Sequence, residues 1–485
     1  MSGKDYRLFK TLDKLTKPKS IAIVGASEKP RSWGYMITKN LMEGGYNGKI
    51  FPVNPKLNKL FGLDVHSNIG EIGKTPDLAL ILVPKHRVFE VLEDCSKSSI
   101  EIVVVFSSGF SEIGEEGAPY EAKLSELAQR LNIRVVGPNC NGFYNAAMRL
   151  NATEIKSRFI KEGPMVLISQ SGFIGRSMTI WGARMGLNIG QFLALGNECD
   201  ITVNDMIKYY GQDPSVKGIG IYIEGLKDGK GFMKTARDVA QEKVIVSLRA
   251  GKYAAGARAA LSHTSKIAGN TGVYEGMLKQ IGVASVDTAE HLLCTTYAMI
   301  DLPLLKGGRL GIVTIGGGYG VLLSDALSRA GLDVPELSQQ MKSELRGIVT
   351  ETRASVRNPI DLGATWPVDI DLVLKVSELI LASDEVDGLV IHDLIDAING
   401  TLWSGSEGID VPLEKLENIC SLSDRFGKPL LICSPIRSLE MDGSELIRRR
   451  VFLRLEDIAV ALSSSLFRGK WKNDMDSKEN EIEIS

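Results

Sequence analysis

His263 has the surroundings in this chain that best suit covalent chemistry on phosphorus. It lies in the run 259–269 of small and hydroxyl side chains, with Arg258 before it and Lys266 after it. Small side chains let a backbone segment approach a ligand closely, the two cations favour an anion, and a neutral imidazole can attack phosphorus. A lone histidine is more often an ordinary surface or core residue, so this interpretation depends on phosphate-binding elements elsewhere in the chain.

Two glycine-rich turns are candidates for such elements, because each follows an apolar run typical of a strand and precedes an amphipathic segment. Their residues are Ser169, Gln170, Ser171 and Gly172 in the first turn, and Gly316, Gly317 and Gly318 in the second. A helix start leaves several N–H groups without intrahelical acceptors and carries about half a positive charge. An anion held by both helix starts would gain roughly 1–2 kcal/mol from each. One such turn is common, but two turns and a histidine together predict one shared site for phosphohistidine.

Glu224 is the candidate partner of the histidine. It ends the predicted strand 218–224, and open α/β sheets place their sites at the carboxyl ends of strands. A carboxylate there can accept a hydrogen bond from one imidazole nitrogen and leave the other free to attack. From position alone, a surface or capping glutamate is an equally good interpretation.

A third turn, Gly25-Ala26-Ser27, follows the predicted strand 20–24 and favours binding of a phosphate or pyrophosphate. A nicotinamide-dependent dehydrogenase is disfavoured, because the G-x-G-x-x-G spacing is absent and the second strand ends in 51–56 without an acidic residue for a ribose hydroxyl. Lys56 suits an additional phosphate. A nucleotide with a 3′-phosphate and a long arm, such as coenzyme A, fits this edge; a purely structural Rossmann-type module is the alternative.

The elements that must position these residues alternate between short β-branched runs and amphipathic stretches, which predicts parallel α/β domains. The segment 166–175 is similar to 311–320, and the register continues from 183–187 to 328–332 at a constant offset of 145 residues. This internal repeat predicts two similar α/β units. We therefore expect domains at 1–150, 151–305 and 306–470, with a charged and disordered tail at 471–485.

Composition excludes several classes of protein. The chain has 485 residues, a formal net charge of −2 and 44% hydrophobic residues, which is typical of a globular protein without a basic field for nucleic acid. Its 6 cysteines lack C-x-x-C spacing, which argues against zinc and disulfides and favours a reducing cytoplasm. No signal peptide or membrane-spanning run is present, and we expect no metal site.

Taken in order, these motifs resemble the α subunit of ADP-forming acyl-CoA synthetases, a family that includes acetate–CoA ligases and is related to succinyl-CoA synthetase. The resemblance covers roughly 18–468. It rests on 24–27, 52–56, 83–84 and 137–142 in the first module, and on Ser169–Gly172, the Tyr-Ile-Glu-Gly segment at Glu224, Ser262-His263-Thr264, 316–320 and 358–362 in the others.

The resemblance implies a Rossmann-like CoA-binding domain followed by two flavodoxin-like domains. It implies that phosphate displaces CoA from an acyl-CoA, that His263 takes the phosphoryl group from the acyl phosphate, and that ADP then receives it. The ligase requires a separate ATP-grasp β subunit, in an α2β2 assembly, that carries ADP or ATP and Mg²⁺. The implied CoA-binding residues are Gly25, Ala26, Ser27, Asn54, Lys56, Val83, Pro84 and Asn139.

The chain departs from the family pattern at some positions. Ser265-Lys266 follow the histidine where Gly-Ser is usual, Ile315 replaces an asparagine, Tyr319 replaces a proline, and Asn141 replaces an apolar residue. These departures are the support for an alternative function, a regulatory protein that binds CoA or acyl-CoA on the same scaffold. The resemblance implies a small carboxylic acid or its acyl-CoA as the substrate.

Overall fold

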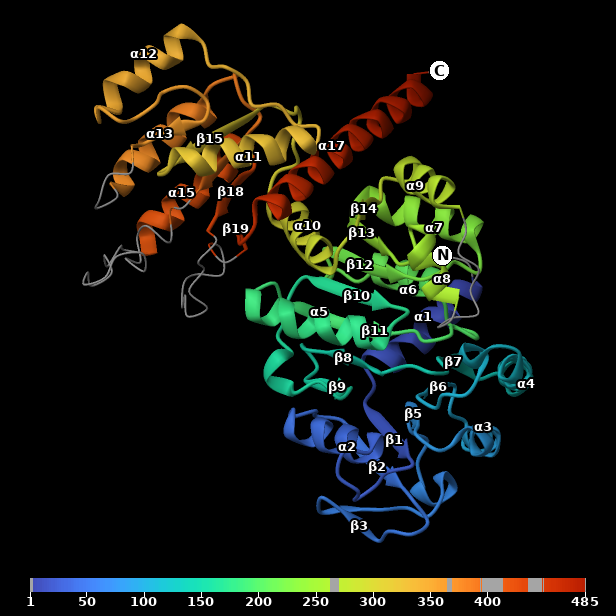
Figure 1. The fold of residues 1–485 in the computed structure, drawn as a ribbon. Helices are drawn as coiled ribbons and strands as arrows, with labels where there is room; N and C mark the ends of the chain where they lie inside the picture. The colour runs from blue at the N-terminus through green and yellow to red at the C-terminus, as the bar shows by residue number, and fades with distance from the viewer. Residues whose placement is uncertain are drawn as a thin grey trace. The chain divides into compact units, whose positions relative to one another are not determined.

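Three mainly parallel sheets follow one another along the chain, as the alternation of apolar runs and amphipathic segments predicts (Figure 1). This computed structural model describes residues 3–261, 270–363, 369–392, 394, 413–434, 447 and 449–484. The chain divides into two compact units, Met1–Arg184 with Asn188–Ser285 and Met185–Leu187 with Val286–Ser485. Among the described helices, none is both long enough and apolar enough to cross a membrane.

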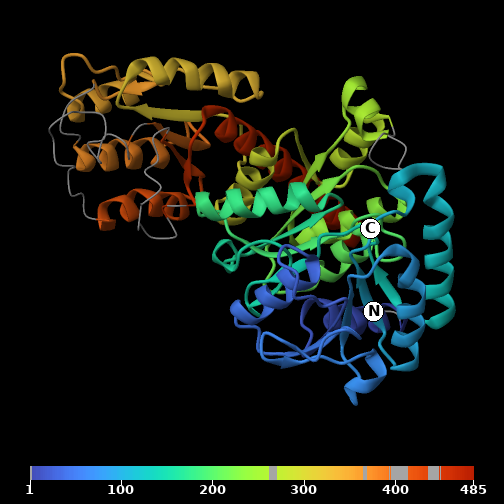
Figure 2. The same ribbon diagram turned by 60° about the horizontal axis from the view of Figure 1, so that its bottom comes forward.

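The first sheet has the strand order β2-β1-β5-β6-β7, and every neighbouring pair is parallel. All four residues of β5 are apolar and buried, which is typical of a parallel sheet covered on both faces. Figures 1 and 2 show α2 on one face and α3 with α4 on the other. The elements are β1 Ser20–Val24, α2 Trp33–Glu43, β2 Lys49–Val53, β5 Leu78–Ile81, α3 Val88–Lys97, β6 Ile102–Val105, α4 Ala118–Leu131 and β7 Arg134–Val136, with a small hairpin of β3 Lys59–Leu60 and β4 Leu63–Asp64 and 3-10 helices at Ile69–Ile72, Lys85–Arg87 and Ser111–Glu116.

The second sheet has the order β14-β13-β12-β10-β11-β8-β9. Strands β11, β10, β12 and β13 are parallel to one another, and an antiparallel hairpin of β8 and β9 extends the sheet beyond β11. The elements are β8 Phe143–Asn145, β9 Leu150–Ala152, a 3-10 helix at Ser157–Phe159, β10 Met165–Ser169, α5 Gly172–Met185, β11 Ile189–Ala194, α6 Val203–Gly211, β12 Gly218–Ile223, α7 Gly229–Glu242, β13 Val244–Arg249, α8 Ala254–Leu261, α9 Thr271–Gln280 and β14 Ala284–Val286.

The third sheet, in the second unit, has the order β16-β15-β17-β18-β19 and is parallel throughout. Leu389 and Ile391 of β17 pack in a core with Val373, Val376 and Ile380 of α13. The elements are α10 Ala289–Asp301, β15 Leu310–Thr314, α11 Gly317–Arg329, α12 Gln339–Ile348, β16 Ile360–Asp361, α13 Ile370–Ala382, β17 Gly388–His392, α15 Leu413–Phe426, β18 Leu430–Cys433, β19 Val451–Phe452 and α17 Leu455–Ile484.

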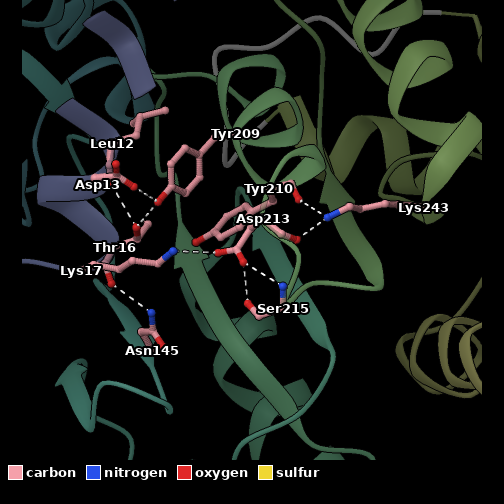
Figure 3. A network of polar contacts seen from close by, with 10 residues as sticks. All are labelled: Leu12, Asp13, Thr16, Lys17, Asn145, Tyr209, Tyr210, Asp213, Ser215 and Lys243. Carbon is pink, nitrogen blue, oxygen red and sulfur yellow. Dashed lines mark hydrogen bonds and ion pairs between the residues drawn. The ribbon is translucent and has the colours of Figure 1, made fainter. Parts of the chain in front are cut away.

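Helix α1, Gly3–Thr16, precedes the first strand and is bonded to the second sheet (Figure 3). The hydroxyl of Tyr209 on α6 lies 2.6 Å from Oγ1 of Thr16 and donates to Oδ1 of Asp13 at 2.8 Å. The amide of Asn145 on β8 donates to the carbonyl of Thr16 at 3.1 Å. Polar groups at the end of α1 therefore tie this helix to α6 and β8 within one unit.

Asp213, in the loop after α6, extends this network to the chain that follows α1 (Figure 3). Lys17 donates to its Oδ2 at 3.1 Å, and the hydroxyl of Ser215 donates to its Oδ1 at 2.6 Å. Burial alone would raise the pKa of Asp213, but the hydrogen bonds from Ser215 and the ion pair with Lys17 together lower the pKa below its ordinary value. The carboxylate form therefore stabilises the fold.

The prediction of disorder for residues 471–485 is wrong, because α17 continues to Ile484. Ile458, Ala461 and Leu462 on its first half are buried, and so is Trp471 at the start of the predicted tail. Elongation of a helix that packing has already nucleated costs little. A charged segment without an apolar stripe can therefore remain helical.

Two predicted domain limits differ from the packing. The limit at 150 falls in the hairpin of β8 and β9, which pairs with β11 in the second sheet. Helix α10 precedes the limit at 305 but belongs to the second unit, where Nε2 of His291 lies 3.5 Å from Oδ1 of Asp457 on α17. Arg449 also donates to Asp301 at the end of α10 at 3.4 Å. The three-domain division itself stays a prediction.

Candidate active site

A cavity of about 520 Å³ lies in the first unit at the carboxyl ends of β10 and β12. In the second sheet β10 is flanked by β11 and β12, so this is the point at which the strand order reverses and where open α/β sheets bind ligands. The lining residues are Ser111, Glu112, Asn139, Asn141, Gln170, Ser171, Gly172, Phe173, Gly196, Asn197, Tyr222, Glu224, Ala250, Gly251, Gly256 and Ala259. The structure thus brings the first predicted phosphate turn and Glu224 to one cavity.

The turn from β10 into α5 is held by its own serines. The hydroxyl of Ser169 donates to the carbonyl of Ser171 at 2.6 Å and accepts from the Ser171 N–H at 3.2 Å. A Cβ added at Gly172 would lie 2.2 Å from Cγ of Asn141, so a glycine is required where the helix begins. Ser169 is buried beneath the turn, whereas Ser171 and Gly172 border the cavity. The first turn of α5 is therefore available to an anion.

The side chain of Gln170 joins three segments and fixes the backbone at Glu224. Its Oε1 accepts from the N–H groups of Glu224 at 2.7 Å and Gly225 at 3.1 Å. Its Nε2 donates to the carbonyl of Gly225 at 2.8 Å and to Oε2 of Glu198 at 2.7 Å. All four bonding positions of this side-chain amide are thus engaged with protein groups, which makes Gln170 a residue that positions Glu224.

Tyr222, near the end of β12, and Glu224, directly after it, line the cavity wall. Burial, followed by the negative charge of Glu224, raises the pKa of Tyr222 to about 12. The phenol is therefore protonated at neutral pH and can donate a hydrogen bond into the cavity. Glu224 is itself partly exposed, as a residue that meets a substrate must be.

Helix α8 brings the chain from the cavity toward the predicted nucleophile. Gly256 and Ala259 of α8 line the cavity. His263 follows Ala259 by four positions in the sequence but lies outside the described residues. Its catalytic role stays a prediction. Arg258, in the last turn of α8, is one of the two cations that lie near the histidine in the sequence.

Polar residues that the sequence reasoning missed contribute a second wall of this cavity. Oε2 of Glu112 accepts from the Phe110 N–H at 3.1 Å and from Nδ2 of Asn197 at 2.6 Å. Asn197 also accepts from Nδ2 of Asn139 at 3.3 Å. The signal that could have found Glu112 is the Ser-Ser-Gly-Phe turn after β6, at residues 107–110, which resembles the other strand-to-turn junctions.

A second cavity, of about 770 Å³, lies at the carboxyl ends of β1 and β5 in the first sheet. It is lined by seven of the eight residues predicted to bind CoA, namely Gly25, Ala26, Ser27, Asn54, Lys56, Val83 and Pro84. The eighth, Asn139, lines the first cavity. The structure thus separates Asn139 from the other seven and places it next to the phosphate turn.

Glycines let the first turn and its helix pack closely at the second cavity. Gly25 has φ +98°, and a Cβ added at Gly34 would lie 2.2 Å from the carbonyl oxygen of Gly25. Nδ2 of Asn54 donates to the carbonyl of Ala26 at 2.7 Å, and Oδ1 of Asn54 accepts from the Lys56 N–H at 2.9 Å. Asn54 therefore ties the second strand to the turn and places Lys56 at the rim.

Gly316–Gly318 begin α11 in the second unit, in the geometry of the first turn. The hydroxyl of Thr314 donates to the carbonyl of Gly316 at 2.9 Å and accepts from the Gly316 N–H at 3.2 Å, as Ser169 does with Ser171. A Cβ added at Gly317 would lie 2.5 Å from Oδ2 of Asp361. The predicted internal repeat is confirmed at this level of detail. The two turns belong to different units, and their joint use stays a prediction.

Comparison with known proteins shows what these sites belong to. Residues 19–146 match the family model of a CoA binding domain, and residues 162–299 match that of a succinyl-CoA ligase like flavodoxin domain. The acetate–CoA ligase (ADP-forming) II subunit alpha of Pyrococcus furiosus is 34% identical over 454 residues, which cover 93% of this chain and 96% of the relative. This chain belongs to the family of ADP-forming acetate–CoA ligase α subunits.

Other members of the family agree with this assignment. The acetate–CoA ligase (ADP-forming) of Methanocaldococcus jannaschii is 35% identical over 362 residues, which cover 75% of this chain and 50% of the relative. The dinucleotide forming acetyl-coenzyme A synthetase 1 of Ca. Korarchaeum cryptofilum, solved in complex with phosphate and ADP, has a TM-score of 0.81 and 29% identity, with coverage of 95% of this α subunit and 97% of that chain. The predicted family and fold class are therefore confirmed. Within the described residues, no three His, Cys, Asp or Glu side chains form a metal-binding group.

Proposed function

We propose that this chain is the catalytic α subunit of an ADP-forming acyl-CoA synthetase that works through phosphorylated His263. A phosphate oxygen attacks the thioester carbonyl carbon, the carbon–sulfur bond breaks, and CoA leaves as the thiol after taking a proton. An imidazole nitrogen of His263 then attacks phosphorus of the acyl phosphate, and the carboxylate leaves. In the last step a β-phosphate oxygen of ADP attacks the phosphohistidine, which forms ATP and frees the imidazole.

The observation that carries this proposal is the cavity at the ends of β10 and β12. It combines a helix start with space for an anion, the carboxylate of Glu224 and the helix α8 that leads to His263 in the sequence. Such a helix start stabilises a phosphoryl group, and Glu224 would accept a hydrogen bond from the second imidazole nitrogen. Gln170 keeps Glu224 at the wall through the two N–H bonds described above.

CoA is assigned to the second cavity at its nucleotide end. The turn Gly25–Ser27 would hold the pyrophosphate, and Lys56 at the rim would pair with the 3′-phosphate. Asn139 borders the reaction cavity and is therefore assigned to the thioester end of the same molecule. The match of residues 19–146 to a CoA binding domain supports this assignment.

A separate β subunit completes the enzyme. We assign to it the ATP-grasp domain that binds ADP or ATP with Mg²⁺, in an α2β2 assembly in the cytoplasm, and we assign a second phosphate-binding turn to Gly316–Gly318 of this chain. A relative that matches 93% of the chain is itself a subunit alpha, which supports a two-subunit enzyme. The same relative is named as a ligase, which favours the catalytic function over the regulatory alternative.

The test is transfer of labelled phosphate to one histidine. The chain is purified with its β subunit and incubated with acetyl-CoA and ³²P-labelled phosphate. We expect label that is stable in alkali and labile in acid, absent in His263→Ala and retained in the control His86→Ala, a change at an exposed histidine outside the cavity. Label that persists in His263→Ala, or acyl-CoA-dependent ATP synthesis by that variant, refutes the proposal.

A further inference from the structure

The three sheets share one ligand-binding topology. In each, the first of the parallel strands is flanked by the second and third of them: β1 by β2 and β5, β10 by β11 and β12, and β15 by β16 and β17. Parallel sheets of this order bind ligands at the carboxyl ends of the first and third strands, where the order reverses. In the first two sheets a cavity lies at that point. The corresponding point of the third sheet lies between the Gly316 turn and the end of β17.

His392 ends β17 at this point. It pairs in register with Thr314, just as Tyr222 pairs in register with Ser169 in the repeated unit. Thr314 and Ser169 support the two glycine-rich turns by the same pair of hydrogen bonds. His392 therefore occupies the place that Tyr222 has at the wall of the reaction cavity.

The environment of His392 is unusual for a structural histidine. Its side chain is 0% exposed, and neither ring nitrogen has a hydrogen-bond partner in the part of the chain that the structure describes. Burial lowers its pKa to about 4, so the ring is neutral at physiological pH and has one N–H donor and one acceptor nitrogen. Buried polar groups without partners are unfavourable, so an N–H held in this way points to a partner that arrives with a ligand.

Tyr319, on the first turn of α11, holds the imidazole beside the helix start. The two rings are stacked, with centroids 4.2 Å apart and an angle of 20° between their planes. Tyr319 is 45% exposed, so its ring covers the histidine on the solvent side. Stacking fixes the plane of the imidazole, which in turn fixes the directions in which its two nitrogens can bond.

The carboxylate of Asp361 lies close to the start of α11. Its Oδ2 would lie 2.5 Å from a Cβ at Gly317, and its Oδ1 accepts from the Gly363 N–H at 2.9 Å. A carboxylate this close to the helix start opposes a second anion there. A neutral N–H donor on another element would offset this repulsion by attracting the bound anion.

We propose that His392 is a phosphoryl-binding residue that donates its ring N–H to an oxygen of a phosphate or acyl phosphate held at the start of α11. This inference rests on the proposed function in that it takes Gly316–Gly318 as the second phosphate turn. It adds a residue from β17 to that turn.

Two variants separate hydrogen bonding from packing. His392→Phe keeps a ring against Tyr319 but has no ring nitrogen, whereas His392→Gln keeps an N–H donor. In the enzyme with its β subunit, we expect His392→Phe to raise the KM for inorganic phosphate about tenfold, as expected for one hydrogen bond to a charged group, and His392→Gln to restore most of the loss. The KM for acetyl-CoA should stay within about twofold in both, because the affected bond is made only to the phosphoryl group. A matched control is His291→Gln on α10, a partly buried histidine outside this turn.

An unchanged phosphate KM in His392→Phe overturns the inference, as does an equal rise of both KM values. A second measurement does not depend on turnover. The full chain with ¹⁵N-labelled histidine is titrated with inorganic phosphate and, separately, with acetyl phosphate, and the ring signals that are missing in His392→Phe are followed by NMR. A saturable shift supports the inference and shows which of the two ligands binds; no shift with either ligand refutes it.

The same spectra distinguish this inference from the proposed function. They are repeated on His263→Ala, which cannot form phosphohistidine. A His392 shift that persists in His263→Ala, together with no ³²P label on His263 of the native enzyme, would refute the proposed function and leave the phosphoryl-binding role in place. Phosphorylation of His263 without any response at His392 would do the reverse.

Discussion

Replacement of Gln170 by leucine tests whether a buried amide holds the reaction cavity together. Gln170 is 6% exposed, and its side chain makes four hydrogen bonds to Glu224, Gly225 and Glu198. Leucine has a similar volume, so the change removes hydrogen bonds with little change in packing. Each buried group left without its partner costs about 1–3 kcal/mol. Water that enters from the adjacent cavity will satisfy part of these groups, and we expect a net destabilisation of about 2–4 kcal/mol.

The assay is urea unfolding of the full chain, followed by circular dichroism in the transition of the first unit. We expect Gln170→Leu to lower the urea midpoint with an unchanged slope, because stability changes but the exposed surface does not. A destabilisation smaller than about 0.5 kcal/mol, a value typical of surface changes, would refute the reasoning.

Gln170→Glu is a sharper comparison for the same prediction. It keeps the oxygen that accepts from Glu224 and Gly225 but replaces the donor with an oxygen that faces Oε2 of Glu198, which lies 2.7 Å from Nε2 in the native chain. Repulsion between two carboxylates favours protonation. The variant should therefore be less stable at pH 8 than at pH 5.5, relative to the native chain. Equal relative stability at the two pH values would contradict this geometry.

Three further predictions address the turn, the CoA site and the link to α1. Gly172→Ala should lower the rate of phosphate-dependent turnover at least about tenfold, because the added Cβ would lie 2.2 Å from Cγ of Asn141. A second change in the same chain, Asn141→Gly, should recover much of the lost rate. Native turnover of the single variant would contradict this prediction. Lys56→Ala should raise the KM for CoA about fivefold but leave that for dephospho-CoA, which lacks the 3′-phosphate, unchanged; equal effects would exclude this contact. The pKa of Asp213 is lower in the folded chain, so the contribution of its carboxylate to stability is present above the ordinary pKa of 3.8 and is lost as the pH falls through the folded value. Thermal unfolding of Asp213→Asn between pH 6 and 3 should therefore depend less on pH than unfolding of the native chain.

The sequence predicts two of the strands at the cavities well. Strand β1 has the predicted bounds 20–24, and β12 ends at Ile223, one residue before the predicted limit, because each is a β-branched or apolar run that is followed by a glycine or a carboxylate. Such a run is typical of a strand buried on both faces, and its signal is entirely local. Strand β11 was not predicted. It contains Gly190, where a Cβ would lie 2.1 Å from the carbonyl oxygen of Gly163, so its glycine reflects a contact made elsewhere in the chain.

The candidate site was predictable only in part, for a related reason. The turns and Glu224 are recognisable from local spacing. The role of Gln170 depends on Glu198 and Gly225, which lie 28 and 55 positions further along the chain. Asn197 and Glu112 meet across 85 positions. Local patterns do not contain such pairings, and the same is true of the helical tail, whose first half is held by packing.

The separation of Asn139 from the other predicted CoA-binding residues has a consequence for the evolution of this enzyme. In the proposed assignment, a CoA molecule that spans both cavities is held at its nucleotide end by the residues of the second cavity and presents its acyl group at the first. Mutations around Glu112 and Asn197 would then change which acid is activated, while the nucleotide part of CoA would still be bound in the same way. This arrangement would allow the enzyme to evolve specificity for new acids without changes in its binding site for the nucleotide part of CoA.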